Sequence, residues 1–328
     1  MEFMLRIYLD QNKWIEIAHG LKAGSASAPD VITVIGAAVD HGYASFPLSA
    51  GHVFETWKAA SARRRHDLAP VMAAISKNHT IAAASSLLPG ELDRALQRRF
   101  GRPALLLPLQ PFGWGLSHSF GQPLPQLSEE TRAAIRAHDP SLAEQEITAW
   151  LELALLAGPP EDMPVAGIAQ PPLQFAEAFA ADETTQAELF AQHGADKDLR
   201  RRAVSARQMI DIKDELSAAQ MRANVTNDEI RTLGVDGVTE LLLDLPSRAA
   251  GHRMMWWQHD NPQTKWKPND LDDISYLSVA VGYCDVVVTE RHWAHVLNVS
   301  GAAEQAGAIV TSKLDDLTEL LVRASLAA

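Results

Sequence analysis

Residues 285–289, Asp-Val-Val-Val-Thr, decide the fold class of this chain. Three successive valines favour an extended strand. The run is too uniformly apolar for a sheet with one face in water, and it is typical of a parallel strand that is buried on both faces. Residues 270–280 before it and 291–297 after it have the composition of helices. We therefore predict an α/β fold in which this strand lies inside a parallel sheet.

Strand and helix also alternate at both ends of the chain. Residues 4–9, Met-Leu-Arg-Ile-Tyr-Leu, predict an apolar strand that ends at Asp10. The other predicted elements are helices at 12–19, 30–40 and 314–322, strands at 43–48 and 308–311, and a helix that Ser49 caps. Because parallel strands are joined through crossover helices, we expect the two chain ends to build one sheet.

The middle of the chain has a different character. Proline clusters at 103–125 and 159–172 interrupt it, whereas residues 128–157 and 173–222 have helical composition. Residues 80–88 fit a strand and a helix equally well. We predict a discontinuous domain of residues 1–99 and 251–328, interrupted by a mostly helical insertion at 100–250.

The overall composition limits the class of protein. The 328 residues include 47% apolar and 21% charged residues, which is enough to bury a core. A net charge of −12 argues against a protein that only binds nucleic acid, and it is compatible with clustered carboxylates. The single cysteine, Cys284, excludes an internal disulfide and a multi-cysteine zinc site. Without an apolar run of membrane-spanning length or a signal peptide, we expect a cytoplasmic protein with no membrane partner.

Acidic residues follow several of the predicted strands. Ligands of open parallel sheets bind at the carboxyl ends of the strands, so these acids are expected to converge. Carboxylates that face one point repel each other unless a cation neutralises them. Mg²⁺ and Mn²⁺ prefer such oxygen ligands, and two such ions together can activate water in phosphodiester hydrolysis. The residues concerned are Asp10, Glu55 and Glu290, together with Asp270, Asp272 and Asp273 at the start of the predicted helix at 270–280.

This order of motifs resembles the PIN-domain nuclease superfamily. The family's first strand, Asp and nearby Asn correspond to Ile7-Tyr-Leu-Asp10-Gln-Asn12, and its second acid to Glu55 after Ser49. Its later half corresponds to residues 270–280, followed by Cys284-Asp-Val-Val-Val-Thr289-Glu290. The resemblance covers about residues 3–85 and 268–325. One departure concerns the fourth acid, which in the family often lies two places after the Thr, where this chain has Arg291.

The resemblance implies a three-layer α/β/α fold and a nuclease that depends on Mg²⁺ or Mn²⁺, a ribonuclease in preference to a deoxyribonuclease. It implies that Asp10, Glu55 and Asp273 bind metal, with Asp272 as a further ligand and Glu290 as a catalytic assistant. The residues expected to contact the nucleic acid are Asn12, Ser49, Arg63, Arg64, Thr289 and Arg291.

Simpler interpretations of the same residues stay open. Asp10 could cap the helix that follows it, Glu55 could be a solvated helix acid, and Glu290 could lie in a surface loop. Asp270, Asp272 and Asp273 could be first-turn acids that the helix dipole favours. Arg63-Arg64-Arg65 could be a solvated helix face. Tryptophans and lysines interleave at Trp256, Trp257, Lys265, Trp266 and Lys267, where they could stack bases or simply pack the core.

Other functions also remain possible from the sequence. A phosphatase that uses Asp10 as nucleophile usually has a second Asp two residues later, where this chain has Asn12. A catalytically inactive PIN-like component of a toxin, defence or regulatory assembly is the main alternative to the enzyme, and a purely structural helical protein is a third. The sequence leaves open whether the chain forms a homo-oligomer or binds a regulatory protein.

Overall fold

A computed structural model describes residues 4–23, 29–124, 127–139, 144–158, 173–261 and 263–327 of this chain. Its main sheet has four strands in the order β2-β1-β5-β6, and every neighbouring pair is parallel. The strands are β1 (Leu5–Leu9), β2 (Ala44–Ser45), β5 (Val286–Val288) and β6 (Ile309–Thr311). The α/β class and the parallel sheet built from both chain ends are therefore confirmed.

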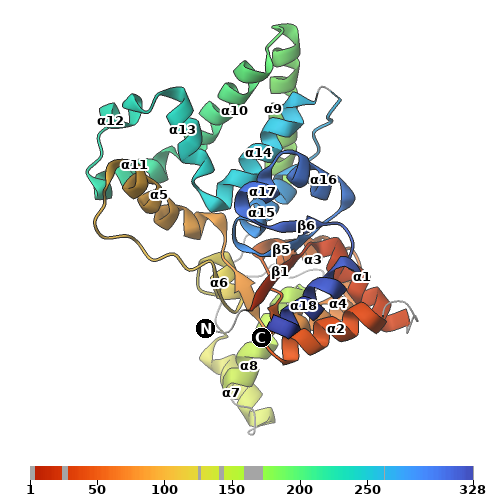
Figure 1. The fold of residues 1–328 in the computed structure, drawn as a ribbon. Coiled ribbons are helices and arrows are strands. Elements are labelled where there is room, and N and C mark those ends of the chain that lie inside the picture. Colours follow the sequence, from red (N-terminus) through yellow and green to blue (C-terminus); the bar gives the residue numbers. More distant parts are fainter. Residues whose placement is uncertain are drawn as a thin grey trace.

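Alternate residues of the central strands enter two separate cores. Ile7, Leu9, Val286 and Val288 pack on one face, while Tyr8 and Val287 pack on the other. The first face is covered by α1 (Gln11–Ala23), α2 (Pro29–Asp40), α3 (Ala50–Lys58), α4 (Ala62–Ser76) and α18 (Asp316–Ala327). The second is covered by α14 (Pro246–Asp260), α15 (Asp270–Tyr283), α16 (Arg291–Val299) and α17 (Ala302–Ala306). Figure 1 shows the sheet between these two sets of helices. Burial on both faces explains why β5 is uniformly apolar.

The region around residue 80 contains both a strand and a helix. β3 (His79–Ile81) pairs antiparallel with β4 (Phe112–Trp114). Leu48 forms a parallel bridge with Thr80, which connects this small sheet to the segment after β2. The chain then enters α5 (Ala84–Phe100).

The predicted strand at 43–48 is much shorter than expected, because Pro47 has no N–H to donate to a neighbouring strand. The predicted irregular segment after residue 100 contains β4 and a short helix, α6 (Leu116–Phe120).

The described part of the middle region is mostly helical, but it does not form a separate core of its own. It contains α7 (Glu129–His138), α8 (Glu144–Ala157), α9 (Leu173–Gln192), α10 (Lys197–Asp211), α11 (Lys213–Ala223), α12 (Asn227–Thr232) and α13 (Gly234–Leu243). The α8 helix buries Leu155 and Leu156 in the first core, and α9 and α10 contribute Ala180 and Val204 to the second. The second proline cluster, at 159–172, lies outside the described residues.

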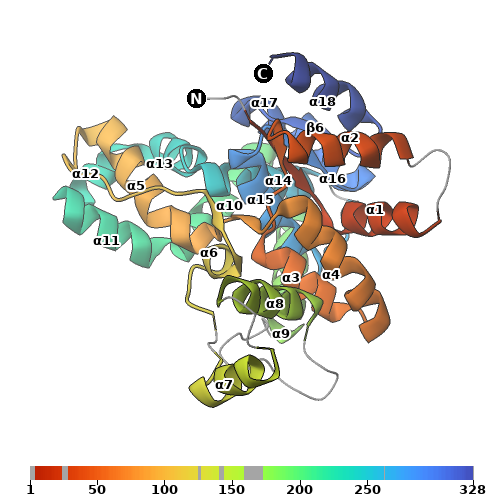
Figure 2. The same cartoon turned by 90° about the horizontal axis from the view of Figure 1, so that it is seen from below.

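A third core joins the middle region to α5. Leu88 and Leu92 of α5 pack with Leu216 of α11 and Leu241 of α13. Figure 2 shows α5 together with α11, α12 and α13 on one side of the molecule. In packing, α5 therefore groups with the helices after residue 200, although it precedes residue 100. Among the residues that the structure describes, no helix combines the length and apolar composition needed to cross a bilayer.

Candidate functional site: carboxylates at the ends of the central strands

Asp10 lies directly after β1, beside the end of β5. Leu9 is paired with Val288, so the next residues of the two parallel strands, Asp10 and Thr289, are neighbours. Thr289 Oγ1 donates a hydrogen bond of 2.6 Å to Asp10 Oδ2, and the backbone N–H of Gln11 donates one of 2.8 Å to Asp10 Oδ1. A capping side chain usually contacts the second or third helical N–H rather than the first. The contacts of Asp10 therefore orient its carboxylate at the strand ends.

Glu55 and Asp273 belong to the same electrostatic cluster as Asp10. Burial, together with the negative charges of Asp10 and Asp273, raises the pKa of Glu55 to about 8. Burial, with a contribution from the charges of Asp10 and Glu290, also raises the pKa of Asp273 to about 7. A hydrogen bond of 2.8 Å from Trp293 Nε1 to Asp273 Oδ2 acts against it. Glu55 comes from α3 and Asp273 from the first turn of α15. We call Asp10, Glu55, Asp273 and Glu290 the carboxylate cluster.

Two other acids at the start of α15 have different surroundings. Asp272 Oδ2 lies 2.6 Å from the ammonium of Lys58, which neutralises it. Asp270 is buried and accepts a hydrogen bond of 2.8 Å from the backbone N–H of Lys267. Asp270 therefore holds the turn before α15, in agreement with the interpretation as a helix-start acid. The charge of Asp10 is one of the causes that raise the pKa of Asp273.

A buried histidine holds the end of β1, the strand that leads to Asp10. His52 Nε2 donates to the carbonyl of Leu9 at 2.8 Å, while its Nδ1 accepts from the backbone N–H of Ser49 at 2.9 Å. These two contacts require a neutral ring, and burial lowers the pKa of His52 to about 4. The Tyr8 hydroxyl completes the network at 3.2 Å from Ser49 Oγ. His52 is thus a positioning residue, and its place three residues after the N-cap Ser49 was the available sequence signal.

The predicted substrate-binding residues differ in their exposure to solvent. Asn12, Arg63, Arg64 and Arg291 are exposed, on α1, α4 and α16. Thr289 is fully buried and serves Asp10. Ser49 is also buried, at the N-cap of α3. Gln11, which no sequence pattern singles out, has a buried side chain that donates to Thr56 Oγ1 at 3.0 Å and so connects α1 to α3 beside Asp10.

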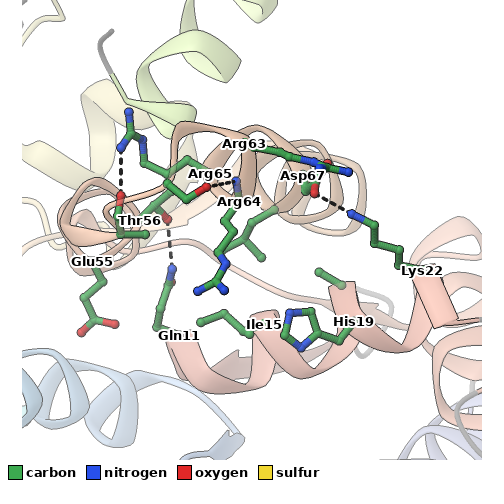
Figure 3. Close-up of a pocket in the computed structure, with 14 residues that line it drawn as sticks. Gln11, Ile15, His19, Lys22, Glu55, Thr56, Arg63, Arg64, Arg65 and Asp67 are labelled. Carbon is green, nitrogen blue, oxygen red and sulfur yellow. Dashed lines mark hydrogen bonds and ion pairs between the residues drawn. The ribbon is translucent and has the colours of Figure 1, made fainter. Parts of the chain in front are cut away.

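A groove between α1 and α4 leads to the cluster. This α1/α4 groove has a volume of about 600 Å³, and Glu55 is one of its lining residues. Figure 3 shows the Glu55 carboxylate at one end and the Lys22–Asp67 ion pair, of 2.8 Å, at the other. The guanidinium of Arg64 points into the space between the two helices. The groove thus combines a carboxylate of the cluster with an exposed cation.

A second groove approaches the cluster from the opposite set of helices. This α14/α15 groove has a volume of about 570 Å³, and Asp273 and Glu290 line it. Its wall also contains exposed cations and a half-buried indole. These are Lys265, Lys267 and Trp257. The cluster therefore has a groove with exposed cations on each side, although the whole chain is acidic.

The described residues contain no group of three or more His, Cys, Asp or Glu side chains placed so that they could hold a metal ion. The carboxylate cluster is therefore open: the charge of Asp10 helps to raise the pKa of Glu55 and of Asp273, but the cluster does not form a closed cage. The sequence matches no family model, and neither the curated proteins nor the solved structures contain a match to this chain.

Proposed function

We propose that this protein is a PIN-like, divalent-metal-dependent nuclease that hydrolyses phosphodiester bonds, with RNA as the preferred substrate. The observation that carries the proposal is the convergence of Asp10, Glu55 and Asp273. These residues come from three separate parts of the fold, and the charge of Asp10 helps to raise the pKa of both Glu55 and Asp273. Half-buried carboxylates that repel each other are stabilised by a cation. The preference for RNA rests on the family resemblance.

The donor set fits a hard cation. All members of the cluster offer carboxylate oxygens, the ligands of Mg²⁺ and Mn²⁺. Mg²⁺ usually takes one or two protein carboxylates and keeps several waters, so a closed cage of three side chains is not required. When bound, the cation would supply a nucleophilic water and stabilise the departing oxygen. Asp10 and one of its neighbours, Glu55 or Asp273, would hold it.

The other residues would act on substrate and protons. Glu290 is exposed at the rim of the α14/α15 groove, where its carboxylate would accept a proton from the attacking water. Thr289 holds Asp10 by its 2.6 Å hydrogen bond, and so keeps one carboxylate oxygen fixed. Arg64 in the α1/α4 groove would contact a phosphate of the nucleic acid.

A second candidate is a PIN-like component that binds nucleic acid or protein without cleaving. The open geometry of the carboxylate cluster favours it. The two candidates differ in metal affinity. A calorimetric titration with Mn²⁺ distinguishes them. The enzyme should bind Mn²⁺ through the cluster, whereas a pure binding component should show neither Mn²⁺ binding nor cleavage.

The direct test compares Asp10→Asn with Asp285→Asn. Asp285 lies at the opposite end of β5, where its carboxylate accepts from the backbone N–H of Arg6 at 2.7 Å. With Mn²⁺ and fluorescent single-stranded RNA and DNA, Asp10→Asn should lower the cleavage rate at least about 100-fold, and Asp285→Asn should leave it within about twofold. Both variants should keep the wild-type circular dichroism spectrum. An active Asp10→Asn enzyme would refute the mechanism.

A further inference from the structure

A third groove lies between α10 and α14, next to the α14/α15 groove. This α10/α14 groove has a volume of about 510 Å³ and three lining cations, Lys197, Arg201 and Arg253. Trp257 and Asn261 line both this groove and the α14/α15 groove, so the two share a wall. A path therefore leads from the helices of the middle region past Trp257 to Asp273 and Glu290 of the carboxylate cluster.

The α10/α14 groove holds more positive charge than its acids neutralise. Lys197, Arg200 and Arg201 all surround Asp260, at 3.5, 3.5 and 3.0 Å. Arg253 donates instead to neutral groups, the Gln305 side chain and the carbonyl of Ser300. Partial burial and the nearby charge of Arg201 lower the pKa of Arg253. The negative charge of Glu304 opposes this lowering in part. The three lining cations thus face one lining carboxylate, that of Asp260, in a chain whose net charge is −12. This local excess attracts an anion.

Trp257 supplies an aromatic surface between the positive charge and the carboxylates. Its indole is half-buried, and the rings of His292 and His295 meet it edge-on, at centroid distances of 6.2 and 5.9 Å. These contacts hold the indole in place. Aromatic side chains beside a cationic groove are the usual platform for unpaired bases, because every base has a face that can stack. A paired base in a duplex does not offer that face.

We propose that the α10/α14 groove binds the phosphates of a single-stranded nucleic acid, one of whose bases stacks on Trp257 as the strand continues to the carboxylate cluster. The proposal rests on the proposed function, since it names the form of that substrate. It also assigns a role to the middle region of the chain, whose helix α10 contributes two of the cations.

Binding without cleavage tests the proposal. The full-length protein in EDTA is titrated into a fluorescein-labelled oligouridylate of about 12 nucleotides, and anisotropy gives the Kd. Lys197 is mostly exposed and lies at 3.5 Å from its partner, so Lys197→Gln removes charge with little loss of packing. We expect it to weaken binding about threefold to tenfold and to reduce the slope of log K against log salt by about 0.7. Trp257→Leu should weaken binding about tenfold, and Trp257→Phe less.

Arg202→Gln is the matched control. Arg202 lies on the same helix, pairs with Asp198 at 3.8 Å and does not line the groove. It should bind as the wild type does, and duplex RNA of the same length should bind more weakly than the single strand. Wild-type Kd values for Lys197→Gln and Trp257→Leu would overturn the proposal. Equal binding of duplex and single strand would overturn the stacking step, and binding of an acidic peptide in place of the oligouridylate would identify a protein partner.

The result is separable from the outcome for the proposed function. EDTA prevents metal-dependent cleavage, so the anisotropy measurement depends only on binding. A protein that never cleaves but loses affinity in Lys197→Gln and Trp257→Leu would support the groove and refute the nuclease. Cleavage by the wild type, together with unchanged oligouridylate affinity in both variants, would support the nuclease and refute the groove.

Discussion

Thr289 Oγ1 donates a 2.6 Å hydrogen bond to Asp10 Oδ2 across 279 residues of sequence. The contact follows from the register of the parallel pair, in which Leu9 is paired with Val288 and the next two residues become neighbours. Thr289 is fully buried, so its hydroxyl has no access to water and is committed to this carboxylate. One oxygen of Asp10 is thereby fixed, while the side chain remains half-buried at the edge of the carboxylate cluster.

Thr289→Val tests this relationship, because valine keeps the shape and removes the donor. We expect a loss of stability of about 1 kcal/mol and a fall in cleavage rate of about tenfold, since Asp10 becomes free to rotate. Thr311→Val is the control: Thr311 occupies the next strand end and donates to Asp316, outside the cluster. Cleavage assays and urea denaturation measure both variants. Equal activity in the two would show that the Thr289 contact is only structural.

Trp293→Phe tests how Asp273 is held. The indole donates to Asp273 Oδ2 at 2.8 Å, and this bond stabilises the ionised carboxylate. Without it the pKa of Asp273 rises above its value of about 7, so the acidic limb of the pH–rate profile should move to higher pH. Trp14→Phe is a matched control, because within the described part of the chain its buried Nε1 has no hydrogen-bond partner. A profile that moves equally in both variants would indicate a general packing effect.

Glu55→Gln should stabilise the metal-free protein while it abolishes cleavage. Since burial and neighbouring charges raise the pKa of Glu55 to about 8, its ionisation disfavours the folded state. The folded protein binds the proton that the unfolded chain has already lost, so wild-type stability decreases as pH rises from about 4.5 to 8. The advantage of Glu55→Gln should be absent near pH 4 and reach at least about 1 kcal/mol above pH 8.

Thermal denaturation in EDTA at several pH values measures this advantage. Addition of Mn²⁺ should raise the melting temperature of the wild type more than that of Glu55→Gln, because a ligand that binds the folded state stabilises it. If the stability difference between Glu55→Gln and the wild type does not vary with pH, ionisation of Glu55 does not destabilise the folded state. Equal Mn²⁺ stabilisation of the two proteins would remove Glu55 from the metal site.

Arg64→Gln should weaken substrate binding more than the chemical step. Its exposed guanidinium points into the α1/α4 groove and has no ion-pair partner among the residues described. Loss of one phosphate contact should raise KM about threefold to tenfold and leave kcat within about twofold. Arg323→Gln, at an exposed position on α18, controls for the change in total charge. A fall in kcat with unchanged KM would place Arg64 at the reacting phosphate instead.

Part of this architecture is readable from local pattern. Val286–Val288 predict a strand buried on both faces, and the two opposing cores confirm it. Asp10 is visible as the acid at the end of an apolar strand, and its position follows from the alternation of strand and helix. Such features depend on residues near in sequence, whose periodicity reports burial directly.

Only the tertiary structure decides which acid has which neighbour. Lys58 neutralises Asp272 from 214 residues away, whereas Asp273, one position later, faces Asp10 and receives the Trp293 hydrogen bond. Adjacent helix residues point about 100° apart, so a single position changes the partner completely. The same holds for Trp257, whose place in two grooves depends on how α10 and α15 pack against α14. Local sequence pattern is therefore enough to predict the α/β sheet and the acid at the end of its central strand. Long-range packing decides which carboxylates are paired, which lie beside other carboxylates, and which grooves lead to them.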